Sequence, residues 1–349
     1  MEQVLEDFLD GLPEVVHSGH NMFHARYRMG VRWIPVGEPS SPEALFSDAD
    51  AALLRHGNRN PGERYVIYDQ QVHEQQKQIL KIEERLREAM HSDARGLSIH
   101  LQPKVEMGQR RIIGAEALLR WDDPELGLIS PGRFVPIAEQ SGLIFELGQW
   151  VVGRVLGLLA SWRDDPVLGQ LHLALNAAPE EFQYEFYSER ILQGLSEHGV
   201  APERLEVEVT ERVLAGVQDV GRLDGLGQLR RAGVAVSLDD FGTGYSSLGY
   251  LASMLISRLK IDKRFVDAVP PQTDSEPAMA GIIVNLAEQL GLECVAEGVE
   301  SVEQADWLLD AGCRYAQGYY YARPMPVEAF IVLARSGLGA VSAKPAGQA

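Results

Sequence analysis

The chain has 349 residues, of which 45% are hydrophobic and 23% charged, and its formal net charge is −18 at pH 7. Length and composition predict a globular protein with one large domain and one smaller unit. The negative net charge argues against a surface that coats DNA or RNA. The two cysteines, Cys294 and Cys313, have no C-x-x-C spacing, which indicates neither a disulfide framework nor a zinc ribbon and makes a reducing cytoplasm the expected location.

Residues 1–70 are expected to form a small α+β unit. The predicted elements are helices over Gln3–Leu12 and Ser41–Arg55 and strands over Phe23–Val36 and Glu63–Tyr68. The second helix is well marked, because Ser41 can act as its N-cap and Pro42 fits the first helical position. The acidic stretch Met1–Asp10 does not have the character of a signal peptide.

Residues 71–94 are expected to form a helical linker. The segment Asp69–Ser92 contains no glycine or proline and is rich in good helix formers. Its sparse apolar stripe consists of Val72, Ile79, Ile82, Leu86 and Met90. A polar helix of this kind connects domains or pairs with a partner helix, and we favour the connecting role.

Residues 95–337 alternate short apolar strands with helices. The predicted strands are Leu97–Gln102, Arg111–Leu118, Leu171–Asn176, Leu205–Thr210, Val234–Asp239, Ser257–Ile261, Glu293–Glu297 and Arg314–Gln317. The predicted helices are Pro131–Gln140, Leu147–Trp162, Tyr184–Glu197, Val220–Ala232, Met279–Leu290 and Val302–Ala311. Eight strands with interleaved helices over about 250 residues are typical of a (β/α)8 barrel.

The first connection of this barrel is unusual. Only Pro103–Arg110 separates the first two predicted strands, which is too short for a crossover helix, so a hairpin there would make one barrel strand antiparallel. The most apolar long window, Leu147–Trp162, contains Gln149 and Arg154 and is expected to be an amphipathic helix and not a membrane span. We therefore expect no membrane segment in this chain, and we expect a disordered tail over residues 338–349.

The stretch Val234–Ser247 is the most informative in the chain. An apolar strand ends on two adjacent carboxylates, Asp239 and Asp240, and a loop with Gly242 and Gly244 follows. Paired carboxylates at a strand end, beneath a glycine loop, suit divalent cations bound through oxygen ligands. An isolated pair of this kind would more often be a solvated turn, so the remaining strands decide its meaning.

Polar residues stand at nearly every predicted strand end, where the chemistry of a β/α barrel is located. They are Gln102, Glu116, Asn176, Glu208, Asp239 with Asp240, Lys260, Glu297 and Gln317. Burying this many carboxylates in one opening is prohibitive without compensating cations.

Two divalent cations together with Lys260 would balance the charge. Glu116, Asn176, Glu208 and Asp239 offer oxygen ligands for one ion, and Asp239 with Asp240 could bridge to a second. Two such ions favour in-line attack of water on phosphorus, with Lys260 orienting that water. An enolase-type barrel is an alternative, because there carboxylates bind Mg²⁺ and a lysine abstracts a proton.

The same positions also match a family. The segment G-A-E-A-L-L-R-W at Gly114–Trp121 resembles the signature of EAL domains, the cyclic di-GMP phosphodiesterases. The other matching segments are Leu101–Lys104, Ser130–Glu139, Leu175–Asn176, Leu205–Glu211, Ser237–Leu248, Leu259–Asp262, Ala296–Glu300 and Gln317–Pro324. The resemblance extends over about residues 95–335 in the expected order.

The resemblance implies a modified TIM barrel with an antiparallel first strand, hydrolysis of cyclic di-GMP to linear 5′-pGpG, and two Mg²⁺ or Mn²⁺ ions. It implies the metal ligands Glu116, Asn176, Glu208, Asp239 and Asp240, with Lys260 and Glu297 at the catalytic water. It also implies that Gln102, Leu118, Arg120, Asp262 and Gln317 line the nucleotide site. Glu211 would hold the loop Asp240–Ser247, which couples metal binding to the formation of a homodimer through the barrel.

The intact ligand set predicts an active enzyme, and the alternative is an inactive cyclic di-GMP receptor that signals through the Asp69–Ser92 helix. Residues 23–70 resemble the back half of a GGDEF domain at Ser47–Leu53 and Arg64–Asp69, although no G-G-[D/E]-E-F stands in the chain. We therefore expect no synthesis of cyclic di-GMP from GTP. The remnant would belong either to a natively shortened protein or to a fragment of a longer one.

Overall fold

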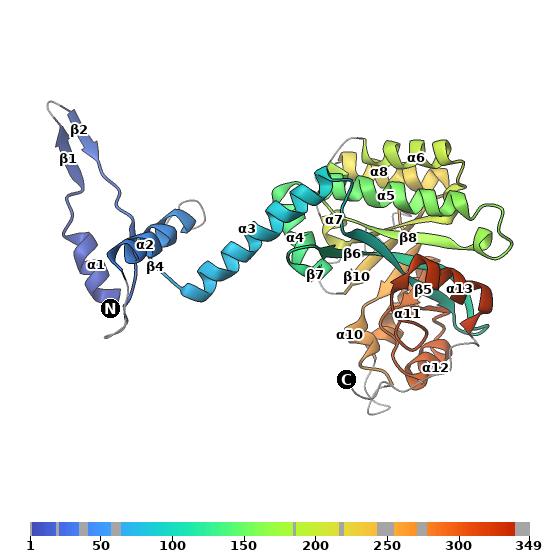
Figure 1. The fold of residues 1–349 in the computed structure, drawn as a ribbon. Helices are drawn as coiled ribbons and strands as arrows, with labels where there is room; N and C mark the ends of the chain where they lie inside the picture. The colour runs from blue at the N-terminus through green and yellow to red at the C-terminus, as the bar shows by residue number, and fades with distance from the viewer. Residues whose placement is uncertain are drawn as a thin grey trace. The chain divides into compact units, whose positions relative to one another are not determined.

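The computed structural model describes residues 2–18, 21–34, 41–56, 64–183, 186–215, 220–242, 255–270 and 278–338 (Figure 1). The chain divides into two compact units, residues 1–84 and residues 85–349. Some predictions lie partly outside the described residues: the loop from Asp240 to Ser247 at residues 243–247, and the tail at residues 339–349. The same holds for the predicted strands Phe23–Val36 at residues 35–36 and Glu63–Tyr68 at residue 63, and for the predicted helix Tyr184–Glu197 at residues 184–185.

The first unit is a small α+β assembly, as predicted. Its elements are α1 (Glu2–Asp10), β1 (Val15–Ser18), β2 (Asn21–His24), β3 (Met29–Val31), α2 (Pro42–His56), β4 (Tyr65–Ile67) and the start of α3 (Gln70–His91). The single strand predicted from Phe23 is instead two strands, because β2 pairs with β1 in a hairpin whereas β3 pairs in parallel with β4. Helix α2 lies directly against β3, since a Cβ on Gly30 would fall 1.9 Å from the carbonyl oxygen of Ala49.

Helix α3 covers the predicted linker and crosses the division between the two units. Asp69 caps its start, because its carboxylate accepts hydrogen bonds from the backbone N–H groups of Gln71 (2.8 Å) and Val72 (3.2 Å). Within the second unit Leu86 is fully buried, and the Arg85 guanidinium binds the buried carboxylate of Asp123 at 3.0 Å. The last turns of α3 are therefore part of the barrel unit.

Eight strands of the described chain close into a barrel. In order around the barrel they are β5 (Leu97–Glu106), β13 (Tyr315–Ala316), β12 (Glu293–Ala296), β11 (Arg258–Ile261), β10 (Ala235–Phe241), β9 (Leu205–Thr210), β8 (His172–Ala177) and β6 (Arg111–Asp123), which pairs with β5 again. β5 is antiparallel to both of its barrel neighbours, and the other neighbouring pairs are parallel. The predicted modified barrel is confirmed.

Two short strands, β7 (Gly127–Ile129) and β14 (Met325–Pro326), extend the sheet beyond the barrel. Strand β5 is four residues longer than predicted, because Pro103 does not end it. β14 pairs with His100 and Leu101, and β13 pairs with Val105 and Glu106, so Pro103 lies in the gap between these pairings. A residue without a backbone N–H is tolerated where no strand pairs along that edge.

Helices surround the barrel (Figure 1). They are α4 (Pro131–Ser141), α5 (Ile144–Ser161), α6 (Tyr187–His198), α7 (Glu211–Ala215), α8 (Val220–Ala232), α10 (Lys263–Val266), α11 (Met279–Leu290), α12 (Val302–Asp310) and α13 (Val327–Ser336). Short sequence motifs determine where several of these helices begin and end. For example, Ser301 and Gln304 form a capping box at the start of α12, and Gly291 ends α11 with φ 69°.

The core lies between the strands and these helices. On β9 the side chains of Leu205, Val207 and Val209 are fully buried in it, which leaves the alternate residues of the strand to face the barrel interior. Within the described residues, α5 is the one helix that is long and apolar enough to cross a membrane by length and composition. Its residues Val151, Val155 and Leu159 belong to the barrel core, so α5 is a packing helix of the barrel unit.

Candidate active site

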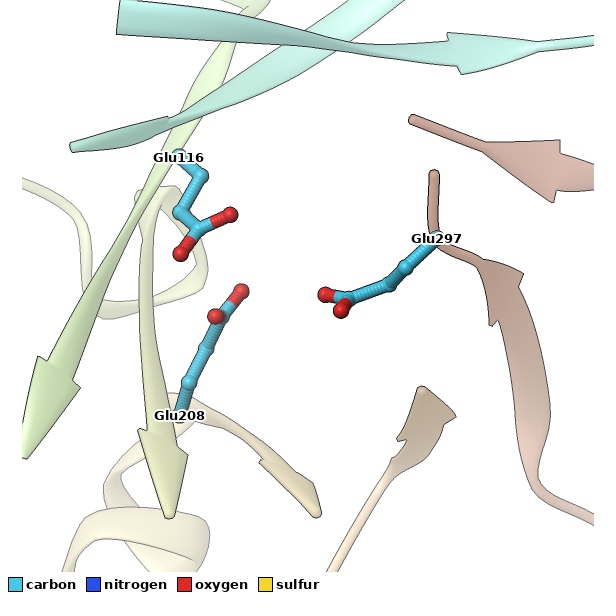
Figure 2. Close-up of side chains that lie close together, drawn as sticks. All are labelled: Glu116, Glu208 and Glu297. Atoms are coloured by element: carbon cyan, nitrogen blue, oxygen red, sulfur yellow. The ribbon is translucent and has the colours of Figure 1, made fainter. Parts of the chain in front are cut away.

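Three glutamates from different strands converge in the opening of the barrel. Glu116 lies on β6, Glu208 on β9 and Glu297 directly after β12, and each offers a carboxylate oxygen within 4.8 Å of the others. Figure 2 shows the three side chains pointing toward one another. Glu116 and Glu208 are buried, with 6% and 1% of their surface exposed.

Lys260 of β11 reaches into this group from another side. Its Nζ forms ion pairs with Glu208, with Asp239 of β10 at 3.1 Å and with Glu297 at 2.5 Å. We call Glu116, Glu208, Asp239, Lys260 and Glu297 the mouth cluster. It holds four carboxyl groups and one ammonium group, which makes the opening strongly acidic.

The pKa values of the mouth cluster report this excess of carboxylates. Burial, together with Asp239, Glu116 and Glu208, outweighs the lowering effect of Lys260 and raises the pKa of Glu297 to about 8. Burial and the neighbouring Glu116 likewise raise the pKa of Glu208. Burial alone would lower the pKa of Lys260, but the surrounding carboxylates raise it well above its usual range. The opening therefore favours additional positive charge.

Amide side chains hold Glu116 in place. Asn176 of β8 donates from Nδ2 to Glu116 Oε1 at 2.7 Å, and Gln317 donates from Nε2 to Glu116 Oε2 at 2.5 Å. Gln317 Nε2 also donates to Oε1 of Gln102 at 2.9 Å, and Gln102 donates to the carbonyl oxygen of Ala322. Four of the predicted site residues, Glu116, Asn176, Gln102 and Gln317, are thus directly linked.

Other predicted residues lie at the rim of the opening. Asp240 has φ 56°, a left-handed conformation that is uncommon outside glycine, and its carboxyl group is hydrogen-bonded to that of Asp262. Burial, Asp239 and Asp262 raise the pKa of Asp240. Glu211 begins α7 and accepts a hydrogen bond from the backbone N–H of Gly242 at 2.8 Å, so it contacts the start of the loop that it was predicted to hold.

Leu118 and Arg120 follow Glu116 along the face of β6 and are half-buried. The Arg120 Nη1 atom donates to the carbonyl oxygen of Leu119 at 2.6 Å. Neither side chain is a member of the mouth cluster. Both remain predicted nucleotide-binding residues.

A second polar group lies deeper in the barrel and was missed as a functional feature. It consists of Lys104, His172, Glu206, Ser237 and Arg258, which we call the lower layer. Arg258, Ser237 and Glu206 each precede a mouth-cluster residue by two positions on the same strand, and Lys104 follows Gln102 by two positions on the reversed β5. The period of two along a strand could have identified it, had the first strand been continued through Pro103.

Glu206 is the centre of the lower layer and is fully buried. Its carboxylate binds Lys104 Nζ at 2.9 Å and Arg258 Nη1 at 2.9 Å, lies 3.2 Å from His172 Nε2 and accepts a hydrogen bond from Ser237. Burial alone would raise the pKa of Glu206, but the charges of Lys104 and Arg258 and the contact with His172 hold it well below its usual range. The lower layer is therefore compensated, in contrast to the mouth cluster.

Comparisons with known proteins agree with this arrangement. A family model described as the EAL domain matches residues 83–324. The chain is 36% identical over 300 residues to the bifunctional diguanylate cyclase/cyclic di-GMP phosphodiesterase MucR of Pseudomonas aeruginosa, covering 86% of this chain and 43% of MucR. It is 35% identical to the cyclic di-GMP phosphodiesterase PdeR of Escherichia coli, covering 84% of this chain and 44% of PdeR.

Solved structures show the same likeness. The PaMucR phosphodiesterase in complex with c-di-GMP has a TM-score of 0.66 and 38% identity, covering 72% of this chain and 99% of that one. The Xanthomonas citri FimX EAL domain in complex with c-diGMP has a TM-score of 0.64 and 26% identity, covering 73% of this chain and 97% of that one. The chain spans less than half the length of MucR and PdeR. By its family match, its sequence relatives and its barrel, the chain belongs to the EAL domain family.

Proposed function

We propose that the chain hydrolyses cyclic di-GMP to linear 5′-pGpG in a reaction that depends on divalent metal ions. The observation that carries this proposal is the mouth cluster, in which Glu116, Glu208 and Glu297 converge within 4.8 Å in a chain of the EAL family. The names of MucR and PdeR as cyclic di-GMP phosphodiesterases support the substrate.

The residues of the opening fit hard cations such as Mg²⁺ or Mn²⁺, because every candidate ligand offers oxygen. We propose two ions, held by Glu116, Asn176, Glu208, Asp239 and Asp240. Bound ions of this kind lower the pKa of an attacking water and stabilise charge on the phosphodiester. Burial and the neighbouring carboxylates raise the pKa of Glu297 to about 8, and bound cations would favour its charged form.

The chain's own residues would bind and orient the reactants. Lys260 Nζ lies 2.5 Å from Glu297 Oε1, and both side chains would hold the attacking water by hydrogen bonds. Gln102 and Gln317 line the opening next to Glu116, and Leu118 and Asp262 would contact the nucleotide. Arg120 would pair with a phosphate, for which its guanidinium geometry is suited.

The two alternatives are less well supported. An inactive cyclic di-GMP receptor would be expected to lack metal ligands, and the predicted ligands are all present in this chain. Membership of the EAL family argues against the enolase-type alternative, in which Lys260 would abstract a proton from carbon. Hydrolysis of the phosphodiester is therefore the function that we propose.

We also propose the organisation of the chain around this activity: a partial GGDEF-like domain over residues 1–70, a helical linker over 71–94 and the phosphodiesterase barrel over 95–337. Glu211 would link the Asp240–Ser247 loop to a homodimer interface of the barrel, and the hydrogen bond from Gly242 to Glu211 supports the first part of that role. The protein would act in the cytoplasm, where reduced cysteines are stable.

The proposal is tested by chromatography of cyclic di-GMP after incubation with the full chain and Mg²⁺. We expect conversion to 5′-pGpG by the wild type and at least a hundredfold slower conversion by Glu116→Ala, since a metal ligand would be lost. Glu288→Ala, which removes an exposed glutamate on α11, is the matched control and should retain wild-type activity. Unchanged substrate together with tight nucleotide binding would instead establish the receptor.

A further inference from the structure

A continuous row of alternating charges runs through the barrel beneath the mouth cluster. Glu208 Oε1 binds Lys104 Nζ at 2.6 Å, and Lys104 binds Glu206 at 2.9 Å. Glu206 binds Arg258 at 2.9 Å, and Arg258 Nε binds Glu293 at 2.7 Å. Lys104 and Glu206 are at most 1% exposed, whereas Glu293 lies half-exposed at the start of β12. The row therefore connects the opening to the opposite end of the barrel.

Burying such a row of charges carries a large desolvation penalty. Branched aliphatic side chains dominate the interior of β/α barrels, and replacing a buried ion pair by well-packed apolar residues is often neutral or stabilising. Stability alone therefore does not account for the lower layer. Its contact with Glu208 gives it a second role, that of holding a residue of the mouth cluster in place.

Lys104 is the member that joins the two layers. Its ammonium group touches Oε1 of Glu208, while the other oxygen of Glu208 faces Lys260. Each oxygen of Glu208 is thus held by a different cation, which sets the plane of the carboxylate. Lys104 is in turn anchored by Glu206 of the lower layer.

We propose that Lys104 is a positioning residue, anchored by Glu206, that orients the Glu208 carboxylate for a divalent cation. This inference rests on the proposed function, because it takes Glu208 as a metal ligand. Hydrogen-bond partners behind metal ligands contribute about 10- to 100-fold to metal affinity in other proteins. Lys104 would act on the ion through Glu208, and it would have no contact with the nucleotide.

The sign of the effect separates orientation from simple charge. Removal of the Lys104 ammonium group leaves the opening more negative, which by charge alone would strengthen the binding of a cation. Weaker binding after this substitution therefore runs against the long-range charge effect and indicates that Lys104 acts on the Glu208 carboxylate itself.

Arg258 supplies the matched control. It binds the same carboxylate of Glu206 at the same distance of 2.9 Å as Lys104 does. Among the contacts of the described residues, its ion pairs go to Glu206 and Glu293 and to no member of the mouth cluster. Lys104→Met and Arg258→Met therefore each remove one cation from Glu206, but only the first changes a contact of Glu208.

The experiment measures Mn²⁺ affinity of the full chain by titration calorimetry, together with thermal unfolding and the separate kcat and KM for cyclic di-GMP. We expect Lys104→Met to weaken Mn²⁺ binding at least tenfold and to lower kcat with little change in KM. Arg258→Met should change Mn²⁺ affinity less than threefold, although both variants unfold at lower temperature. Lys104→Arg, which keeps the charge, should recover part of the affinity.

Thermal unfolding guards against a folding defect, because the Mn²⁺ affinity of Lys104→Met is measured well below its unfolding temperature. Lys104→Met should unfold in a single cooperative transition and bind Mn²⁺ weakly while folded. Equal Mn²⁺ affinities of Lys104→Met and Arg258→Met, or tighter binding by Lys104→Met, would overturn the positioning role. A wild type that binds Mn²⁺ but leaves cyclic di-GMP intact would refute the proposed function while the comparison of affinities still decides the role of Lys104.

Discussion

The mouth cluster and the lower layer share strands β9, β10 and β11, yet their charge balance is opposite. The mouth cluster holds four carboxyl groups, those of Glu116, Glu208, Asp239 and Glu297, around the single ammonium of Lys260. In the lower layer one carboxylate, Glu206, is surrounded by Lys104, Arg258 and His172. The balanced layer is complete within the chain, whereas the acidic one is suited to binding cations from outside.

The pKa values show the same contrast in two glutamates that lie in one barrel. The pKa of Glu206 is well below its usual range because cationic partners outweigh burial, and the pKa of Glu297 is raised to about 8 because burial and like charges outweigh Lys260. Burial raises the pKa of both carboxyl groups, and their charged partners decide whether it prevails. Strong pKa perturbation toward the neutral form is typical of functional sites.

The largest effect on stability is expected from the lower layer. Glu206→Ala leaves Lys104 and Arg258 buried without their shared carboxylate, which costs about 3–5 kcal/mol of unfolding free energy. By contrast, Glu297→Gln in the mouth cluster removes a carboxyl group from an acidic excess, so the metal-free barrel should lose little stability or gain some. Urea unfolding of the chain in the presence of chelator measures the unfolding free energy of both variants. Equal losses of unfolding free energy would contradict the proposed difference between the two layers.

The next effect comes from divalent ions. If they occupy the mouth cluster, Mg²⁺ or Mn²⁺ at 100 times the dissociation constant should stabilise the barrel unit by about 2.7 kcal/mol, which corresponds to a rise in Tm of roughly 5–10 °C. Glu116→Ala should abolish this rise, and Arg258→Met in the lower layer should preserve it. Thermal unfolding with and without the ions is the measurement, and an unchanged Tm in the wild type would remove the case for a cation site.

The smallest effect concerns pH. The pKa of Glu297 is about 8 in the folded chain and about 4.3 in an unfolded one, so between these values the folded state holds more protons and its stability falls as pH rises. Between pH 6 and pH 8 in chelator we expect Glu297 to contribute a loss on the order of 2 kcal/mol. Glu297→Gln should flatten this part of the profile, and saturating Mg²⁺ should reduce it by supplying positive charge. An identical pH profile for the variant and the wild type would count against the raised pKa.

Much of the barrel could be predicted from the sequence, because its local patterns are strong. Alternation along β9 placed Leu205, Val207 and Val209 against the helices and Glu208 in the opening, as the structure has them. The short connection after Gln102 predicted the reversed first strand, since no crossover fits in it. Polar residues in apolar strands located the opening from which the mouth cluster is built.

Other features depend on contacts between distant segments, which local patterns do not contain. Pro103 indicated the end of a strand, so Lys104 was not placed in the barrel. In the structure β5 continues through Pro103, because this residue lies in the gap between the pairings of β14 and β13 and needs no backbone N–H there. In the sequence Arg258 has the pattern of an ordinary strand residue. Its ion pair with Glu206 joins two different strands, so no local pattern contains it. The strand predicted from Phe23 was divided because its two halves find partners in different sheets.

The reversed direction of β5 has a consequence for how the barrel can be controlled. In a barrel of uniformly parallel strands the chain enters at the end remote from the catalytic opening. Here β5 begins beside the carboxyl end of β6, with Leu97 paired to Trp121, and the preceding helix is fastened at that same end by Arg85 on Asp123. The last turns of α3 are therefore joined to the same end of the barrel as the mouth cluster, and a displacement of these turns would act on the rim of the opening without passing through the barrel.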